Sequence, residues 1–119
     1  MSTVPQIALV GCGYWGKNLC RNFHALSALS AVVDATENGH ETARSIAPNV
    51  RVTKSFDNIL ADDQIHGVAL ATPAETHADF AIQAMKAGKD VFVEKPMALT
   101  VDDANEMKQV ALETNSILM

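Results

Sequence analysis

The chain has 119 residues, enough for one domain with a hydrophobic core but not for two. Its 9 basic and 14 acidic residues give a net charge of −5 without a basic run, so neither nucleic acid nor an anionic membrane is an expected partner. No apolar stretch approaches the roughly 18 residues of a membrane span, and residues 1–5 lack the features of a secretory signal. Cys12 and Cys20 form no C-x-x-C pair, so a reduced, cytoplasmic chain is expected.

The first predicted strand, about Gln6–Val10, leads directly into a glycine motif. In this position the motif is typical of a dinucleotide-binding turn between a strand and a helix. Gly11 permits the tight turn, Gly13 lets the backbone approach a pyrophosphate, and Gly16 lets the helix pack closely on its strand. The first turn of the helix then offers N–H groups and a positive dipole end to phosphates. The motif residues predicted to bind the cofactor are Gly11, Gly13, Tyr14, Trp15 and Gly16.

The first predicted helix has an apolar face, because Trp15, Leu19, Phe23 and Leu26 recur at helical spacing. We therefore interpret the side chain of Trp15 as helix packing rather than as a stacking platform. A helix N-terminus can lower the pKa of a thiol, but Cys12 has no histidine nearby in the sequence as a base and is interpreted as a small filler.

The second predicted strand, about Ser30–Asp34, ends in a carboxylate. Asp34 follows Gly16 at close to the spacing of about 20 residues at which an acidic residue binds the adenosine ribose hydroxyls. A strand-end cap is the alternative interpretation. A carboxylate here would repel a 2′-phosphate, and no Arg or Lys occurs in Ala35–Asn38, so the sequence favours NAD over NADP as the cofactor.

Strands and helices continue to alternate to the end of the chain. They are predicted, in chain order, as a helix over Glu41–Ala47, a strand over Val50–Thr53, a short helix capped by Ser55, a strand over Gly67–Ala71, a helix over Glu75–Ala87 followed by Gly88, a strand over Asp90–Glu94, a helix from Thr100 to Thr114, and the start of a sixth strand at Ile117–Met119. This order predicts a doubly wound parallel α/β sheet, the Rossmann fold, with strand order 3-2-1-4-5-6 and strand six incomplete.

In such a sheet, ligands bind beyond the carboxyl ends of the strands. The segments after strands four and five should therefore lie near the nicotinamide, with Thr72, Pro73, His77 and Glu94 as cofactor-binding candidates. For His77, simple exposure in the first helical turn is the alternative. Lys95 taken alone is a surface lysine, but this topology would let its ammonium meet a substrate oxygen. The remaining histidines, His24, His40 and His66, show no ligand spacing, so no metal site is predicted.

Four sequence motifs together resemble the N-terminal domain of the Gfo/Idh/MocA oxidoreductase family over essentially the whole chain. They are Gly11-Cys12-Gly13-Tyr14-Trp15-Gly16, Ala71-Thr72-Pro73 with His77, Ala87-Gly88-Lys89, and Glu94-Lys95-Pro96. The residues of the first and last of these motifs are most similar to those of family members that act on nucleotide sugars, such as UDP-N-acetylglucosamine 3-dehydrogenases. The resemblance implies a catalytic or substrate-positioning role for Lys95.

The resemblance also implies a second, C-terminal domain that carries most of the substrate site, another acid/base residue and a homo-oligomer interface. Residues 1–119 would then be the dinucleotide-binding half of an NAD-dependent oxidoreductase, inactive alone, whose full-length form acts on a secondary alcohol of a sugar, nucleotide sugar or cyclic polyol. The alternative is a non-catalytic NAD-binding regulator of the same superfamily. The motif Glu94-Lys95-Pro96 favours the enzyme.

Overall fold

The computed structural model describes residues 4–119. Residues 1–3, which belong to the N-terminal segment assessed above for a secretory signal, lie outside the described residues. Five parallel strands form one sheet in the order β3-β2-β1-β4-β5, which confirms the predicted Rossmann topology. The strands are β1 (Ile7–Val10), β2 (Leu29–Val33), β3 (Arg51–Thr53), β4 (Gly67–Leu70) and β5 (Asp90–Val93). Beyond β5, Leu118 forms a parallel bridge to Val91, so the chain begins the sixth strand position as predicted.

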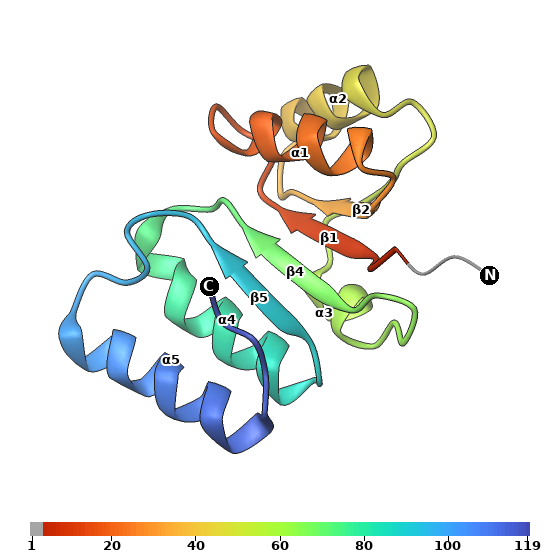
Figure 1. The fold of residues 1–119 in the computed structure, drawn as a ribbon. Coiled ribbons are helices and arrows are strands. Elements are labelled where there is room, and N and C mark those ends of the chain that lie inside the picture. Colours follow the sequence, from red (N-terminus) through yellow and green to blue (C-terminus); the bar gives the residue numbers. More distant parts are fainter. Residues whose placement is uncertain (1–3) are drawn as a thin grey trace.

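The helices cover the sheet from both sides (Figure 1). They are α1 (Gly16–Ala25), α2 (Glu37–Ile46), α3 (Phe56–Leu60), the 3-10 turn η1 (Ala74–Thr76), α4 (His77–Lys86) and α5 (Val101–Thr114). Helices α1 and α2 lie on one face, and α4 and α5 lie on the other. This two-sided cover explains why β4 is buried along its whole length.

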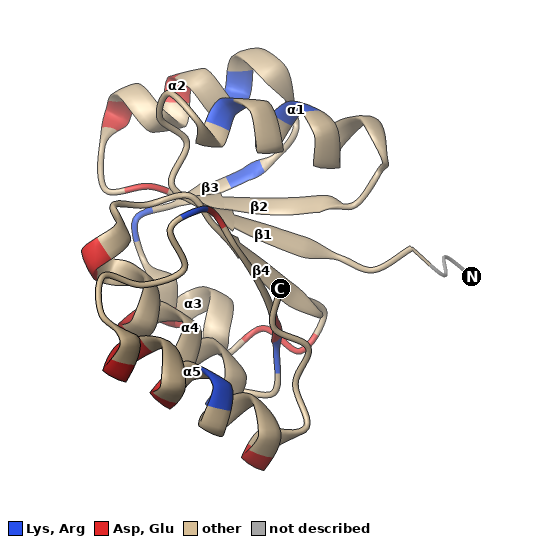
Figure 2. Ribbon diagram, turned by 60° about the vertical axis from the view of Figure 1, so that its left-hand side comes forward, with Lys and Arg blue, Asp and Glu red and all other residues tan. Residues whose placement is uncertain are grey.

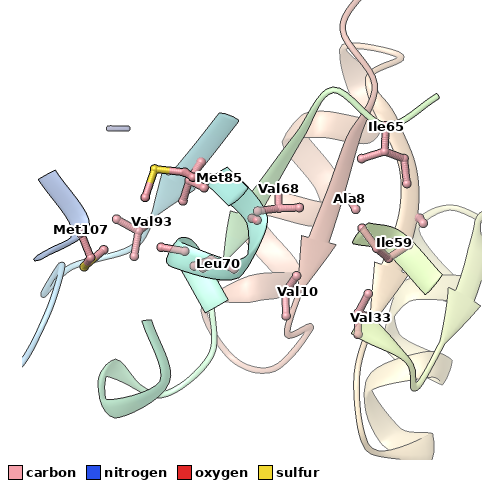
Figure 3. Packing of buried hydrophobic residues seen from close by; sticks show 14 of the residues in the cluster. Ala8, Val10, Val33, Ile59, Ile65, Val68, Leu70, Met85, Val93 and Met107 are labelled. Carbon is pink, nitrogen blue, oxygen red and sulfur yellow. The ribbon is translucent and has the colours of Figure 1, made fainter. Parts of the chain in front are cut away.

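Alternate side chains along the strands belong to two separate hydrophobic cores, one on each face of the sheet. Ala8 and Val10 of β1 join the larger core under α3, α4 and α5, whereas Leu9 joins the smaller core under α1 and α2. In Figure 3, Met107 of α5 lies beside Val93 of β5 at one end of the larger core. The sheet is therefore anchored on both faces, and its loops can be held rigidly at its edge.

Most predicted helix boundaries are confirmed by their caps. The hydroxyl of Ser55 accepts a hydrogen bond from the N–H of Asn58, and that of Thr100 accepts one from Asp103. Gly88, after α4, has the positive φ of 86° expected of a residue that ends a helix. Acidic residues lie in the first turn of α5 and recur along the helix, as Figure 2 shows in red.

Two predictions about the first half of the chain are wrong. Helix α2 begins at Glu37 rather than Glu41, because Thr36 caps it through a hydrogen bond from Gly39. Trp15 and Leu26 do not pack on the core, since they flank α1 at its two ends and are 68% and 66% exposed.

Lys89 is a buried cation at the end of the sheet where the strands begin. Its side chain is only 3% exposed, and its ammonium donates hydrogen bonds to the carbonyl oxygens of Asp62 and Ile65. These bonds fasten the turn that leads into β4. Within residues 4–119, no helix has both the length and the hydrophobicity needed to cross a bilayer.

Candidate nucleotide-binding site

The loops that carry the predicted site all leave the sheet at one edge, because its strands are parallel. At this edge the glycine turn follows β1, Asp34 follows β2, Thr72 follows β4, and Lys95 follows β5. Two clefts lie side by side there, of about 540 and 350 Å³. Ala71 and Thr72 line both clefts, so the two clefts adjoin at these residues.

The glycine turn has room for a ligand at one position and none at the others. Gly11 has a φ of 93°, and a Cβ there would lie 2.9 Å from the carbonyl oxygen of Ala71. A Cβ on Gly16 would collide with the carbonyl oxygen of Gly11, so only glycine lets α1 begin this close to the turn. A Cβ on Gly13 would meet nothing within 4 Å. The exposed backbone at Gly13, beside the first turn of α1, is therefore suited to a pyrophosphate.

Asp34 is fixed at the edge of the larger cleft by three hydrogen bonds. One carboxylate oxygen accepts from the N–H of Cys12 at 2.8 Å, and the other accepts from the N–H and the hydroxyl of Thr36 at 2.8 and 2.7 Å. Burial raises the pKa of Asp34, but these bonds and the nearby His40 outweigh it and lower the pKa overall. Asp34 is thus a fixed anion able to accept hydroxyl hydrogen bonds.

The first turn of α2 supports Asp34 in a way that the sequence analysis missed. A Cβ on Gly39 would collide with the Asp34 carboxylate, so glycine is what lets α2 lie against it. The ring of His40 is buried, with Nε2 2.8 Å from the carbonyl oxygen of Asp34. The sequence shows Gly39 only as a glycine inside a helical pattern, which can indicate a close backbone approach but not to what.

Lys54 is a second residue that the sequence analysis missed. It follows β3 and lines the larger cleft together with Asp34. Its ammonium lies 3.5 Å from the carboxylate of Glu37, the first residue of α2. A cation therefore lines the same cleft as Asp34, although none occurs in the four residues after Asp34. Only the pairing of β2 with β3 brings it there.

The smaller cleft contains Thr72, Glu94 and Lys95 of the residues predicted around the nicotinamide, but not Pro73 or His77. Trp15, Glu94 and Lys95 line it together with Ala71 and Thr72. Lys95 is exposed and Glu94 is half-buried. The backbone N–H of Glu94 donates to the carbonyl oxygen of Leu70, which holds the end of β5 against β4. The cleft thus combines an aromatic ring, a hydroxyl, a carboxylate and an ammonium.

His77 lies behind this cleft rather than on its surface. Its side chain is 1% exposed, with Nδ1 2.9 Å from the carbonyl oxygen of Pro96 and Nε2 2.8 Å from that of Thr72. The ring therefore links the loop after β4 to the loop after β5. Pro73 lines the larger cleft, and its carbonyl oxygen accepts a hydrogen bond from the hydroxyl of Thr76.

The cysteine of the glycine turn is not a reactive group. Cys12 is 1% exposed and packs in the smaller core with Cys20. A hydrogen bond with Cys20, burial and the negative charge of Asp34 raise the pKa of Cys12, so it stays a thiol. In the part of the chain that the structure describes, His, Cys, Asp and Glu side chains form no group of three that could hold a metal ion.

The combined geometry fits a dinucleotide. The open backbone at Gly13 offers a place for the pyrophosphate, and the larger cleft has Asp34 at the position for an adenosine ribose. The smaller cleft adjoins this path and offers space for the second base. Tyr14 is 72% exposed, and its ring meets that of Trp15 edge-on at 5.0 Å.

Comparisons with known proteins agree with this fit. UDP-N-acetylglucosamine 3-dehydrogenase of Acidithiobacillus ferrooxidans is 32% identical over 114 residues, which cover 95% of this chain and 35% of the relative. A 2,7-anhydro-N-acetylneuraminate hydratase of Mediterraneibacter gnavus is 34% identical over 121 residues, covering 100% of this chain and 31% of the relative. The crystal structure of GenD2 from gentamicin A biosynthesis, in complex with NAD, matches with a TM-score of 0.90 and 33% identity over 99% of this chain and 34% of that chain.

The chain therefore spans about a third of the length of the relatives that it matches. Residues 6–119 match the family model GFO_IDH_MocA, described as an oxidoreductase family with an NAD-binding Rossmann fold. With the sheet order, the glycine turn and the fixed carboxylate already in place, this chain belongs to the Gfo/Idh/MocA oxidoreductase family and forms its NAD-binding Rossmann domain.

Proposed function

We propose that the protein uses NAD, in preference to NADP, to transfer a hydride to or from a secondary alcohol carbon of a sugar, nucleotide sugar or cyclic polyol. The observation that carries the proposal is the position of Lys95 in a cleft that shares Ala71 and Thr72 with the one that contains Asp34. The adenosine half of NAD would occupy the larger cleft and the nicotinamide half the smaller one. The names of the sugar-directed relatives support the substrate class.

When bound, the nicotinamide supplies the hydride acceptor or donor. Lys95 would handle the accompanying proton. In the direction of reduction, its ammonium donates a hydrogen bond to the carbonyl oxygen of the substrate and delivers a proton as the hydride reaches the carbon. Oxidation is the reverse of this step, so the neutral amine left after proton delivery would accept the hydroxyl proton and become the ammonium again. Glu94, beside it in the cleft, would help orient the ammonium.

The exposure of Lys95 supports a second element of the proposal. Lys95 is exposed, as are Trp15 and Pro96 next to the same cleft. A hydride-transfer site must exclude water, and these residues leave the cleft open. We therefore propose that a further domain, like the remaining two thirds of the relatives' length, covers the cleft and supplies most substrate contacts. Residues 1–119 alone would bind NAD weakly and turn over no sugar.

Substitution of Lys95 tests the catalytic role. In the intact protein, Lys95→Met should lower kcat by about 10²-fold or more, the scale of a positioned acid/base group, while NAD affinity stays near normal. Lys108→Met, on α5, is a control with the same change of charge outside both NAD clefts. Steady-state rates with sugars, nucleotide sugars and cyclic polyols, together with an NAD titration by calorimetry, provide the measurement. Turnover near the wild-type rate would exclude Lys95 from the mechanism, whereas NAD binding without turnover of any of these substrates by the wild type would favour the regulator.

A further inference from the structure

Trp15 is a large apolar ring held in a defined place without being buried. Its side chain is 68% exposed, although tryptophan normally contributes strongly to a core. Trp15 is the residue immediately before α1, and its ring meets that of Tyr14 at an interplanar angle of 86°. Lys17 in turn places its ammonium 5.0 Å from the centre of the Tyr14 ring. Helix packing therefore does not explain the tryptophan.

The position of Trp15 in the smaller cleft indicates what the ring can contact. Trp15 lines the smaller cleft with Lys95 but does not line the larger cleft, which contains Asp34. The backbone beside it belongs to the turn suited to the pyrophosphate. A dinucleotide whose adenosine lies near Asp34 would therefore bring its other base, the nicotinamide, to the cleft of Trp15.

We propose that the Trp15 indole packs against the nicotinamide ring and binds its oxidised form more tightly than its reduced form. The oxidised ring is a pyridinium cation, whereas the reduced ring is uncharged. Tryptophan has the strongest attraction of any side chain for a cation over its ring face. The inference rests on the proposed placement of the nicotinamide half in the smaller cleft. It implies that the ring face against Trp15 is shielded, so that the hydride moves at the opposite face.

Three ligands measured on the intact protein test the proposal. NAD+, NADH and ADP-ribose share the adenosine and pyrophosphate, but only NAD+ carries the ring cation. Trp15→Leu should weaken NAD+ binding by about threefold to thirtyfold, weaken NADH binding less, and leave ADP-ribose binding unchanged. Trp15→Phe should fall between Trp15→Leu and the wild type. Leu26→Ala is the matched control, because Leu26 is an equally exposed apolar residue at the far end of α1.

A spectroscopic measurement provides a separate readout. An indole stacked on an oxidised nicotinamide gives a long-wavelength charge-transfer absorbance, which should appear when NAD+ binds the wild type and be absent in Trp15→Leu. Equal weakening of NAD+ and NADH would overturn the preference for the oxidised ring. Unchanged NAD+ affinity, or an equal loss for ADP-ribose, would overturn the contact itself. If the wild-type protein binds NAD+ with these signatures but oxidises no alcohol, the proposed reaction is contradicted, whereas the proposed contact between Trp15 and the nicotinamide still holds.

Discussion

The carboxylate of Asp34 accepts a hydrogen bond from the backbone N–H of Cys12, so the acidic residue of the larger cleft also holds the glycine turn. The two residues are 22 positions apart in the chain and follow neighbouring strands. The position of this carboxylate and that of the glycine turn are therefore coupled through one side chain.

Asp34→Ala should weaken NAD binding by about tenfold or more, because it removes a charged acceptor and frees the turn. NADP binding should change less, since the repulsion of its 2′-phosphate is also lost. The preference for NAD would then narrow in calorimetric titrations with both cofactors. Asp57→Ala, which removes an exposed carboxylate from α3, is the control. Tighter binding of NADP than NAD by the wild type would contradict the assignment of Asp34.

The pKa of Asp34 also predicts how stability depends on pH. Because the pKa of this carboxylate is lower in the folded state, its contribution is fully present above the unfolded pKa of about 3.9. The contribution is lost as the pH falls from there through the folded pKa. Urea unfolding between neutral and acidic pH should show a steeper loss in the wild type than in Asp34→Asn. Parallel curves for the two proteins would show that the carboxylate gains nothing on folding.

Glycines 13 and 16 should respond in opposite ways to substitution. Gly13→Val should leave the protein folded and abolish NAD binding, because the added side chain meets only the open space intended for the pyrophosphate. Gly16→Ala should destabilise the fold by about 1–3 kcal/mol, since its methyl group would press on the backbone of Gly11. Thermal unfolding and an NAD titration on both variants separate the two effects. Wild-type affinity in Gly13→Val would show that the phosphates bind elsewhere.

The ion pair between Lys54 and Glu37 gives a route to altered cofactor preference. Both side chains are largely exposed, at 60% and 70%, so the pair is weak and the lysine can be redirected. Glu37→Gln should tighten NADP binding by about twofold to fivefold, the scale of an exposed charge interaction. Adding Lys54→Met to that variant should remove the gain. If the affinity for NADP is the same in the wild type and in both variants, Lys54 does not reach the 2′-phosphate.

Lys89 should matter for folding and not for the cofactor. Lys89→Met leaves the buried carbonyl oxygen of Ile65 without its side-chain donor and removes one of the two donors to the carbonyl oxygen of Asp62, which costs about 1–3 kcal/mol of unfolding free energy. NAD affinity should stay unchanged, because these bonds lie at the opposite end of the sheet from the clefts. Lys86→Met, an exposed lysine of α4, is the matched control for denaturant unfolding. Equal stability of the two variants would argue against the buried ammonium as an anchor.

Periodic local patterns were enough to predict most of the architecture. The continuous apolar run of β4 and the caps at Ser55 and Thr100 depend on neighbours along the chain, and the structure confirms them. The start of α2 could not be predicted in this way. Gly39 weakens a helical pattern by its intrinsic propensity, yet here it is required by contact with Asp34, a tertiary relationship.

In the candidate site, too, the residues set by local sequence could be predicted, and those set by tertiary contacts could not. The glycine turn and Asp34 could be located from spacing alone, because the turn and the strand end are local features. Lys54 could not, since it enters the cleft only through the pairing of β2 with β3. The spacing of Trp15 fitted an apolar helix face, but the residue precedes the first turn of α1, where a side chain is no longer directed by the helix onto the core.

In this parallel sheet, the turns that could accept an inserted sequence lie at the opposite edge from the two clefts. The turns from helix to strand lie at the edge away from both clefts, and Ser27 and Gly88 each occupy one of them with positive φ. Gly88 precedes the buried Lys89, so an insertion there would disturb an anchor. Ser27 is exposed, and exposed loop tips tolerate inserted sequence. A fluorescent tag or an affinity handle inserted at Ser27 would therefore leave cofactor binding intact, giving a place from which to immobilise or label the protein.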